Sequence, residues 1–166
     1  MTNVADNQSE ELSERLEDFL PYQLSVTSNA VSSLIAQRYE ARFGLKIAEW
    51  RIMAVLGDVG SATQRSLAEA TLMDKVAVNR ACKVLGARGL IGREPNAKDG
   101  RSHLLALTAD GRAIHQEVMP LARNIEREVF GTLSQKERTA LRSALKRIFD
   151  VVDSRQSASQ TQAYYQ

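Results

Sequence analysis

Apolar residues recur at every third or fourth position over long stretches of the chain, the spacing that lines one face of an α-helix. The first stretch predicts a helix that ends before Gly44 and presents Leu20, Leu24, Val31, Leu34 and Ile35 on one face. A second helix is predicted near 48–57, with Trp50, Met53, Ala54 and Leu56 on its apolar face. The first third of the chain is therefore expected to be helical.

Two shorter helical patterns follow, over 63–70 and 74–88, joined by a short turn. Asp74 is a suitable N-cap for the second of them, because its carboxylate can accept the free amide protons of the first helical turn. Gly89 ends it. The inward side of this helix is expected to consist of Val78, Ala81, Cys82 and Leu85.

The apolar pattern then changes period. Residues 90–94 and 103–107 are short and typical of strands, and the loop between them is rich in turn formers, with Asp99 and Gly100 inside. This predicts a β-hairpin with a basic tip. Together the elements indicate a mostly α-helical fold with a small β-hairpin.

Two further helices complete the predicted fold. Thr108 can cap a long helix that runs to about Phe130 with a kink at Pro120, and Ser134 with Glu137 forms a capping box for the last helix. That helix carries Leu141, Leu145, Ile148 and Val152 on one face. Residues 1–10 and 154–166 hold few aliphatic side chains, so both ends are expected to be disordered around a single domain at 11–153.

Charge changes this picture, because it is concentrated in one part of the chain. Between Ser61 and Ser102 there are eight basic and four acidic residues, whereas the rest of the chain holds 14 basic and 16 acidic residues. No apolar run has the length of a membrane span, and the acidic N-terminus is unlike a signal peptide. We expect a cytoplasmic protein, with no membrane partner, whose central segment attracts a polyanion.

Two short helices followed at once by a basic hairpin predict a winged helix-turn-helix over about 47–107. The second helix would lie in the major groove of double-stranded DNA. Asn79 and Arg80 can form bidentate hydrogen bonds with adenine and guanine, whereas Lys75 and Lys83 suit phosphates. The alternative is a solvated charged face without a partner. The full set of expected DNA contacts is Thr63, Gln64, Arg65, Lys75, Val76, Ala77, Asn79, Arg80, Lys83, Lys98, Asp99, Arg101 and Ser102.

The hairpin tip has its own predicted chemistry. Arg101 lies two residues after Asp99, so the carboxylate can orient the guanidinium before DNA arrives. An arginine held in this way suits a narrow minor groove, where A·T-rich DNA concentrates negative potential. The alternative is a surface ion pair of small energetic value.

A linked series of motifs resembles the MarR (multiple antibiotic resistance) family of transcription regulators, over about Leu20 to Phe149. The motifs are the segments 49–53, 63–68, 74–80, 88–93, 99–101 and 107–111. The resemblance implies a homodimer formed through helices at about 11–43 and 108–153, and a small-molecule pocket where these meet the winged helix. Ala77 and Asn79 stand where members of the family often have hydroxyl residues, which leaves the operator sequence open.

Short polar residues are unusually dense between Ser25 and Ser33 for a helix interior. The resemblance places this helix at the dimer interface and at the pocket. A small aromatic acid is therefore expected to meet Ser28, Asn29, Trp50, Arg51 and His115, with Arg51 opposite the anion. The alternatives are that Trp50 belongs to the core and that Arg51 pairs with an acidic neighbour.

Other chemistries find little support in the sequence. Cys82, the single cysteine, is expected to pack in the core rather than to sense oxidants, and the two histidines, His103 and His115, lack further ligands for a metal. No catalytic motif and no cofactor is expected. The sequence predicts a DNA-binding transcription regulator, a repressor released by a small effector; the alternative is an architectural DNA-binding protein without an effector.

Overall fold

The computed structural model of the chain describes residues 15–97 and 99–163. The predicted disorder of residues 1–10 and the expected DNA contact of Lys98 lie outside the described residues. The chain forms two compact units, residues 1–121 and 122–166, and the helix α5 runs through the boundary.

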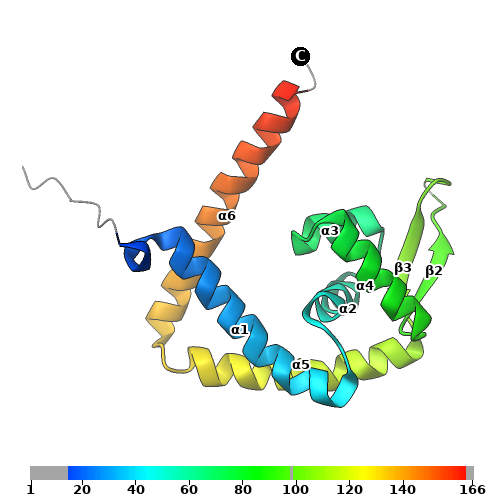
Figure 1. Ribbon diagram of the computed structural model, residues 1–166, viewed down its shortest axis with the longest axis horizontal. Coiled ribbons are helices and arrows are strands. Elements are labelled where there is room, and N and C mark those ends of the chain that lie inside the picture. Colours follow the sequence, from blue (N-terminus) through cyan, green and yellow to red (C-terminus); the bar gives the residue numbers. More distant parts are fainter. Residues whose placement is uncertain (1–14, 98, 164–166) are drawn as a thin grey trace, which may run out of the picture. The chain divides into compact units, whose positions relative to one another are not determined.

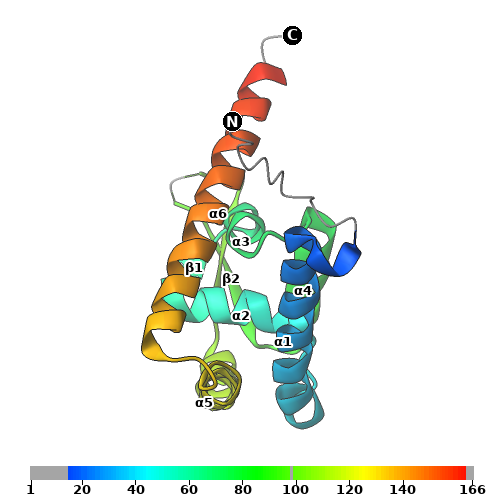
Figure 2. The ribbon, with the colours of Figure 1, turned by 90° about the vertical axis from the view of Figure 1, so that its left-hand side faces the viewer.

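The first unit begins with the short helix η1 (Leu16–Asp18) and the long helix α1 (Leu20–Phe43), followed by α2 (Ile47–Val59). Next come the two short helices of the predicted motif, α3 (Gln64–Thr71) and α4 (Lys75–Ala87). Figures 1 and 2 show α3 and α4 gathered around α2, with α2 beneath α3 in both views.

A three-stranded antiparallel sheet completes this module, in the order β1–β3–β2. The predicted hairpin is formed by β2 (Ile91–Pro95) and β3 (His103–Leu107), and Ile91 lies opposite Leu107. The strand β1 (Ser61–Ala62), which the sequence did not predict, pairs with the far edge of β3. Two residues are too short to show a strand's alternation, and this pairing joins segments more than 40 residues apart.

The core of the module confirms the predicted inward face of α4, because Val78, Ala81, Cys82 and Leu85 are all buried. They pack with Leu67 from α3 and with Ile52, Met53 and Leu56 from α2. The predicted apolar face of α1 behaves differently. Leu20 and Leu24 are exposed, and the buried side chains of α1 are Ala36 and Tyr39, near its C-terminal end.

The predicted caps are present. Asp74 Oδ1 accepts a hydrogen bond from the backbone N–H of Ala77 at 2.8 Å. Thr108 Oγ1 accepts one from the N–H of Gly111 at 3.1 Å, at the start of α5 (Ala109–Phe130). Gly111 is required here, because a Cβ atom would lie 1.9 Å from the carbonyl oxygen of Leu90.

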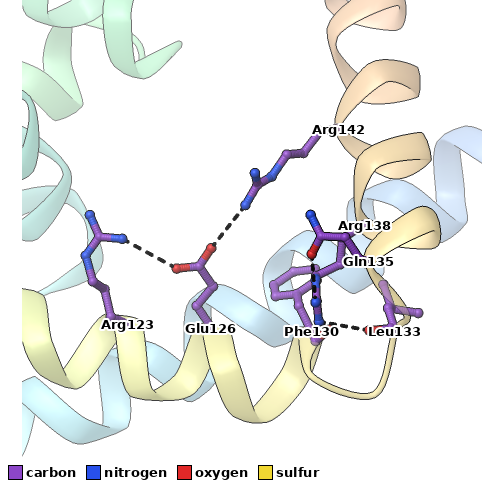
Figure 3. Close-up of polar contacts among 7 residues, drawn as sticks. All are labelled: Arg123, Glu126, Phe130, Leu133, Gln135, Arg138 and Arg142. Atoms are coloured by element: carbon purple, nitrogen blue, oxygen red, sulfur yellow. Dashed lines mark hydrogen bonds and ion pairs between the residues drawn. The ribbon is translucent and has the colours of Figure 1, made fainter.

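The second unit contains the end of α5, a turn and α6 (Gln135–Ala163). Ser134 and Glu137 form the predicted capping box, with reciprocal hydrogen bonds of 2.7 and 3.3 Å. The turn is closed by Arg138, whose guanidinium donates to the carbonyl oxygen of Leu133 at 2.8 Å and to that of Phe130 at 3.2 Å (Figure 3). The unit is thus a helical hairpin held by its own side chains.

The helix α6 continues past the predicted end of order at residue 153, as far as Ala163. The expectation of disorder over 154–163 was therefore wrong. This segment contains neither glycine nor proline, and its Arg, Gln and Ala residues have good helix propensity, so nothing in it ends the helix. In the part of the chain that the structure describes, no helix is both long and apolar enough to span a membrane.

Candidate nucleic-acid interface

The outward face of α4 is a polar surface around one apolar side chain. Lys75, Val76, Asn79, Arg80 and Lys83 are all exposed and together line one shallow hollow in the surface. The helix is held at its start by the Asp74 cap and along its inner side by the core. Ala77, which was also expected to contact DNA, is half-buried and does not line this hollow.

The start of α3 and the hairpin line a second hollow. Thr63 caps α3 by accepting a hydrogen bond from the N–H of Ser66 at 3.1 Å, and Gln64 and Arg65 follow it in the first turn. The hollow brings these three residues together with Asp99, Arg101 and Ser102 of the hairpin tip. Sequence reasoning missed four further lining residues, the polar Arg93, Asn96 and His103 and the apolar Leu105.

Arg93 and His103 belong to this surface because the hairpin pairing brings them together. Arg93 Nη2 lies 3.1 Å from His103 Nδ1 across the two strands. Strand alternation gave no signal for this position, since it places Arg93 on the same face as the buried Ile91 and opposite the buried Leu105 of β3. The basic charge of the hairpin therefore extends from its tip along the strands.

The hairpin tip is a tight turn built by its own hydrogen bonds. The N–H of Asn96 donates to the carbonyl oxygen of Ser102 at 3.1 Å, and Asn96 Nδ2 donates to Ser102 Oγ at 2.8 Å. Asp99 Oδ1 accepts from the backbone N–H of Arg101 at 3.1 Å. The expectation that Asp99 orients the guanidinium was wrong: over two residues its short side chain reaches the backbone instead, as in an Asx turn.

The cations of this surface differ in their partners. Arg65 forms an i,i+4 ion pair with Glu69, at 2.9 Å from Nε to Oε1 and largely exposed to solvent. Within the described residues, Lys75, Arg80, Lys83 and Arg101 form no ion pair. Their charges are therefore available to an external anion without first breaking an internal contact.

The residues expected to bind an effector divide into two groups. Trp50 is buried and stacks on His115, with ring centroids 5.6 Å apart. Its ring also contacts that of Tyr39 in a tilted arrangement, with centroids 5.7 Å apart. Ser28, Asn29 and Arg51 are exposed, so they do not share this environment. The assignment of Trp50 to the core is confirmed, whereas an ion pair of Arg51 with an acidic neighbour is not found among the described residues.

His115 is closely packed against α2. A Cβ atom at Gly57 would lie 2.3 Å from His115 Nε2, so the imidazole occupies the space above this glycine. Burial lowers the pKa of His115, which favours the neutral ring. The hollow beside it is lined by a set of residues that the sequence did not predict, apart from His115: Leu56, Gly57, Gly60, Leu107, Arg112 and Gln116.

Cys82 is buried on the inner side of α4, the expected recognition helix. Burial raises the pKa of its thiol, with a smaller opposing effect of a hydrogen bond to Gln64. A protonated, buried thiol reacts slowly, which supports the interpretation of Cys82 as a packing residue. Over the described residues no group of three or more His, Cys, Asp or Glu side chains could hold a metal ion.

A short helix, a capped and exposed second helix, and a basic hairpin define a winged helix-turn-helix protein. The chain belongs to the MarR family of transcription regulators, whose profile matches residues 43–102. The resemblance, the fold class and the regulatory function predicted from the sequence are thereby confirmed.

Several known proteins resemble the chain over most of its length. The HTH-type transcriptional repressor NicR of Pseudomonas putida is 26% identical over 140 residues, which are 80% of this chain and 89% of NicR. A probable transcriptional regulator from Pseudomonas aeruginosa, of known crystal structure, is 32% identical, covers 81% and 99% of the two chains and has a TM-score of 0.69. Bordetella bronchiseptica BpsR, whose DNA binding is regulated by 6-hydroxynicotinic acid, is 26% identical, with coverage of 82% and 96% and a TM-score of 0.74.

Proposed function

We propose that this protein is a homodimeric repressor that binds a pseudo-palindromic operator through α4 and the hairpin, and that a small aromatic acid releases it. The observation that carries the proposal is the outward face of α4, where three cations without ion pairs surround Asn79 on a helix fixed by a cap and a core. Such a face can contact both the base edges in the major groove of DNA and the phosphates beside it.

Each side chain of this face has a distinct role in the proposal. Asn79 and Arg80 contact base edges, because an amide and a guanidinium can form bidentate pairs with adenine and guanine. Lys75 and Lys83 contact phosphates. Val76 supplies an apolar surface for a thymine methyl group, while Ala77 contributes its backbone to the approach of the helix.

The second hollow contributes the remaining contacts. Thr63, Gln64 and Arg65 at the start of α3 lie beside the DNA backbone, where a helix N-terminus favours phosphate. Arg101 enters the adjacent minor groove, and Asp99 and Ser102 hold the turn from which it projects. Replacing Arg101 by Ala should weaken operator binding in a fluorescence-anisotropy titration while leaving the melting temperature unchanged, because the side chain is exposed and unpaired.

Dimer formation is supported by apolar side chains that each unit leaves exposed. In the first unit these include Phe19 and Leu20, and in the second Leu145, Ile148 and Val152. Rows of this kind are larger than a small monomer usually leaves in water. With two copies of the recognition helix, half-sites should lie roughly 10 base pairs apart, centre to centre.

The proposed class of effector rests on the ligand of a related protein and on the aromatic and cationic side chains of this chain. BpsR is regulated by 6-hydroxynicotinic acid, an aromatic carboxylate, and the chain offers the stacked Trp50 and His115 rings with the exposed cation Arg51 on the same helix as Trp50. Ser28 and Asn29 can take part only if a second chain or a shift of α1 brings them to the ligand. Coupling requires that the acid bind better to the conformation that does not fit DNA.

The test combines a footprint on the promoter upstream of the gene itself with anisotropy titrations. If about eight phosphates are contacted by the dimer, log affinity should fall with a slope near −7 against log salt concentration. Addition of 6-hydroxynicotinic acid should raise the melting temperature and weaken operator binding. An asymmetric footprint or a salt slope near zero would overturn the proposal.

An architectural DNA-binding protein without an effector is the alternative, and it predicts binding that no aromatic acid changes. The proposal includes no catalytic step, and a protein that binds the chromosome of a bacterium acts in the cytoplasm.

A further inference from the structure

Arg88, at the C-terminal end of α4, reaches across to the end of α1. Its Nη1 donates a hydrogen bond to the carbonyl oxygen of Gly44 at 3.0 Å, and its Nη2 donates to that of Phe43 at 2.6 Å. Phe43 is the last residue of α1, and Gly44 is its C-cap in a left-handed conformation, with φ of 61°. One guanidinium therefore joins the ends of two helices.

A buried carboxylate from α2 completes this contact. Glu49 is 5% exposed, and its Oε2 lies 3.9 Å from Arg88 Nη1. The same oxygen accepts a hydrogen bond from the backbone N–H of Lys46 at 3.0 Å, which closes the first turn of α2. Arg88 thus lies where the end of α1, the start of α2 and the end of α4 meet.

The residue type fits this position. The last carbonyl groups of a helix lack partners within it and carry the negative end of the helix dipole, so a cation there is favourable. A guanidinium presents several N–H donors in a fixed plane and can bind two carbonyl oxygens at once, whereas an ammonium is a single point charge. Arginine is therefore expected to fix both the distance and the angle between the two helix ends.

We propose that Arg88 is a positioning residue that fixes the recognition helix relative to α1 and thereby sets the distance between the two recognition helices of the dimer. The proposal rests on the proposed function, in which α1 belongs to the dimer interface and α4 to the DNA interface. The helix α4 packs on α2 and α3, and Arg88 adds a direct connection to α1. Without it, each recognition helix would have more freedom to move relative to the two-fold axis.

The experiment measures affinity for three operators that differ only in the number of base pairs between the half-sites: the native number, one fewer and one more. One base pair displaces a half-site by roughly 3.4 Å and by about a tenth of a turn. We expect the natural protein to favour the native spacing by about tenfold or more, about 1.4 kcal/mol. The Arg88→Lys variant, which keeps the charge, should lower this preference to about threefold or less.

Two further variants separate positioning from general stability. The double variant Arg88→Gln with Glu49→Gln removes both charges, so that no buried carboxylate is left unpaired, and it should also lose the spacing preference. The control Arg42→Gln removes an exposed arginine of the same end of α1, which pairs with Glu117, and should keep the natural preference. Circular dichroism and sedimentation establish that each variant is folded and dimeric.

The outcomes are distinct. If Arg88→Lys keeps the natural spacing preference, or loses the same factor of affinity at all three spacings, Arg88 is only a structural residue and the proposal is overturned. If the natural protein binds none of the palindromic operators, the proposed function itself fails. A loss of spacing preference in both Arg88 variants but not in Arg42→Gln supports the assignment.

Discussion

The winged helix-turn-helix and the terminal helices use the same apolar spacing in different ways. In the module around α2, α3 and α4, the apolar faces meet one another, and Leu67, Val78 and Leu85 are at most 1% exposed. In α1 the first turns leave Leu20 74% exposed, and in α6 Ile148 is 50% exposed. Helical spacing of apolar residues predicted helices in both regions, and the difference lies in what those residues pack against.

This difference indicates which part of the chain buries its apolar side chains without a second copy of the protein. The module closes a core from α2, α3, α4 and the small sheet, together with side chains of α1 and α5, and its two surface hollows are lined mainly by polar and basic residues. The helices α1 and α6, in contrast, expose apolar side chains such as Leu20 and Ile148 to solvent. We therefore expect changes in the two regions to affect different equilibria: folding and DNA contact in the first, association in the second.

The largest effect is expected in α6. Replacing Leu145 and Ile148 by Glu places two charges per subunit in the proposed interface, and the dimer dissociation constant should rise more than about a thousandfold, about 4 kcal/mol. The control Ser143→Glu adds a charge on the opposite side of the same helix and should leave the dimer intact. Sedimentation velocity measures both, and a stable dimer of the double variant would contradict the assignment of this face.

The next largest effect concerns the core of the module. Leu85→Ala should lower the free energy of unfolding by about 2–5 kcal/mol, because a fully buried side chain leaves a cavity beneath α4. The matched change Leu24→Ala, at an exposed position of α1, should alter the unfolding of the monomeric form by less than about 0.5 kcal/mol. Both changes are made in the monomeric variant with Glu at positions 145 and 148, and chemical denaturation measures the free energy of unfolding of each. Equal losses of this free energy would show that the two regions share one core.

A smaller effect separates base contacts from phosphate contacts on α4. Arg80→Ala should cost roughly 1–3 kcal/mol at one base pair of the operator and change the preferred base there, whereas Lys83→Ala should weaken all duplexes alike and reduce the salt slope by about one. Anisotropy titrations on a set of single-base operator variants distinguish the two. Asn79→Ala should behave like Arg80→Ala, and a uniform loss in all three variants would rule out the assigned outward face.

The smallest effect is predicted at the turn between α3 and α4. Leu72 has a left-handed backbone, with φ of 52°, and its side chain is 69% exposed. Glycine adopts this conformation without strain, and little packing is lost, so Leu72→Gly should stabilise the module by roughly 0.5–1 kcal/mol. Thermal unfolding measures the change, and a lower melting temperature would mean that the Leu72 side chain contributes contacts that outweigh the strain.

Local chemistry was predictable from the sequence, and long-range pairing was not. Asp74, Thr108 and Ser134 were identified as caps because a cap acts on amides two or three residues away. The strand β1 was missed because only its distant partner β3 makes it a strand. The prediction that Asp99 orients the guanidinium of Arg101 was wrong, because the backbone N–H of Arg101 is a nearer donor for the Asp99 carboxylate.

The candidate effector residues also show that contacts between distant segments could not be predicted from the sequence. Trp50 and His115 come from α2 and α5, and their stacking depends on how these helices cross, which no spacing within one helix reveals. Ser28 and Asn29 were chosen because short polar residues are unusual within a helix, and this signal says nothing of what they face. Arg88 was counted as part of the basic segment, and its role between helix ends depends on atoms that are 44 and 45 residues away.

The contact of His115 with Gly57 has a consequence for how relatives of this protein can diverge. A methyl group at position 57 would lie within 2.7 Å of three ring atoms of His115, so an alanine there would displace the imidazole from its stack on Trp50. Replacement of His115 by a small residue would instead leave space above Gly57, so that a larger residue could then be accommodated at position 57. We therefore expect substitutions at these two sites to accumulate in a fixed historical order, with position 115 changing first and position 57 only afterwards.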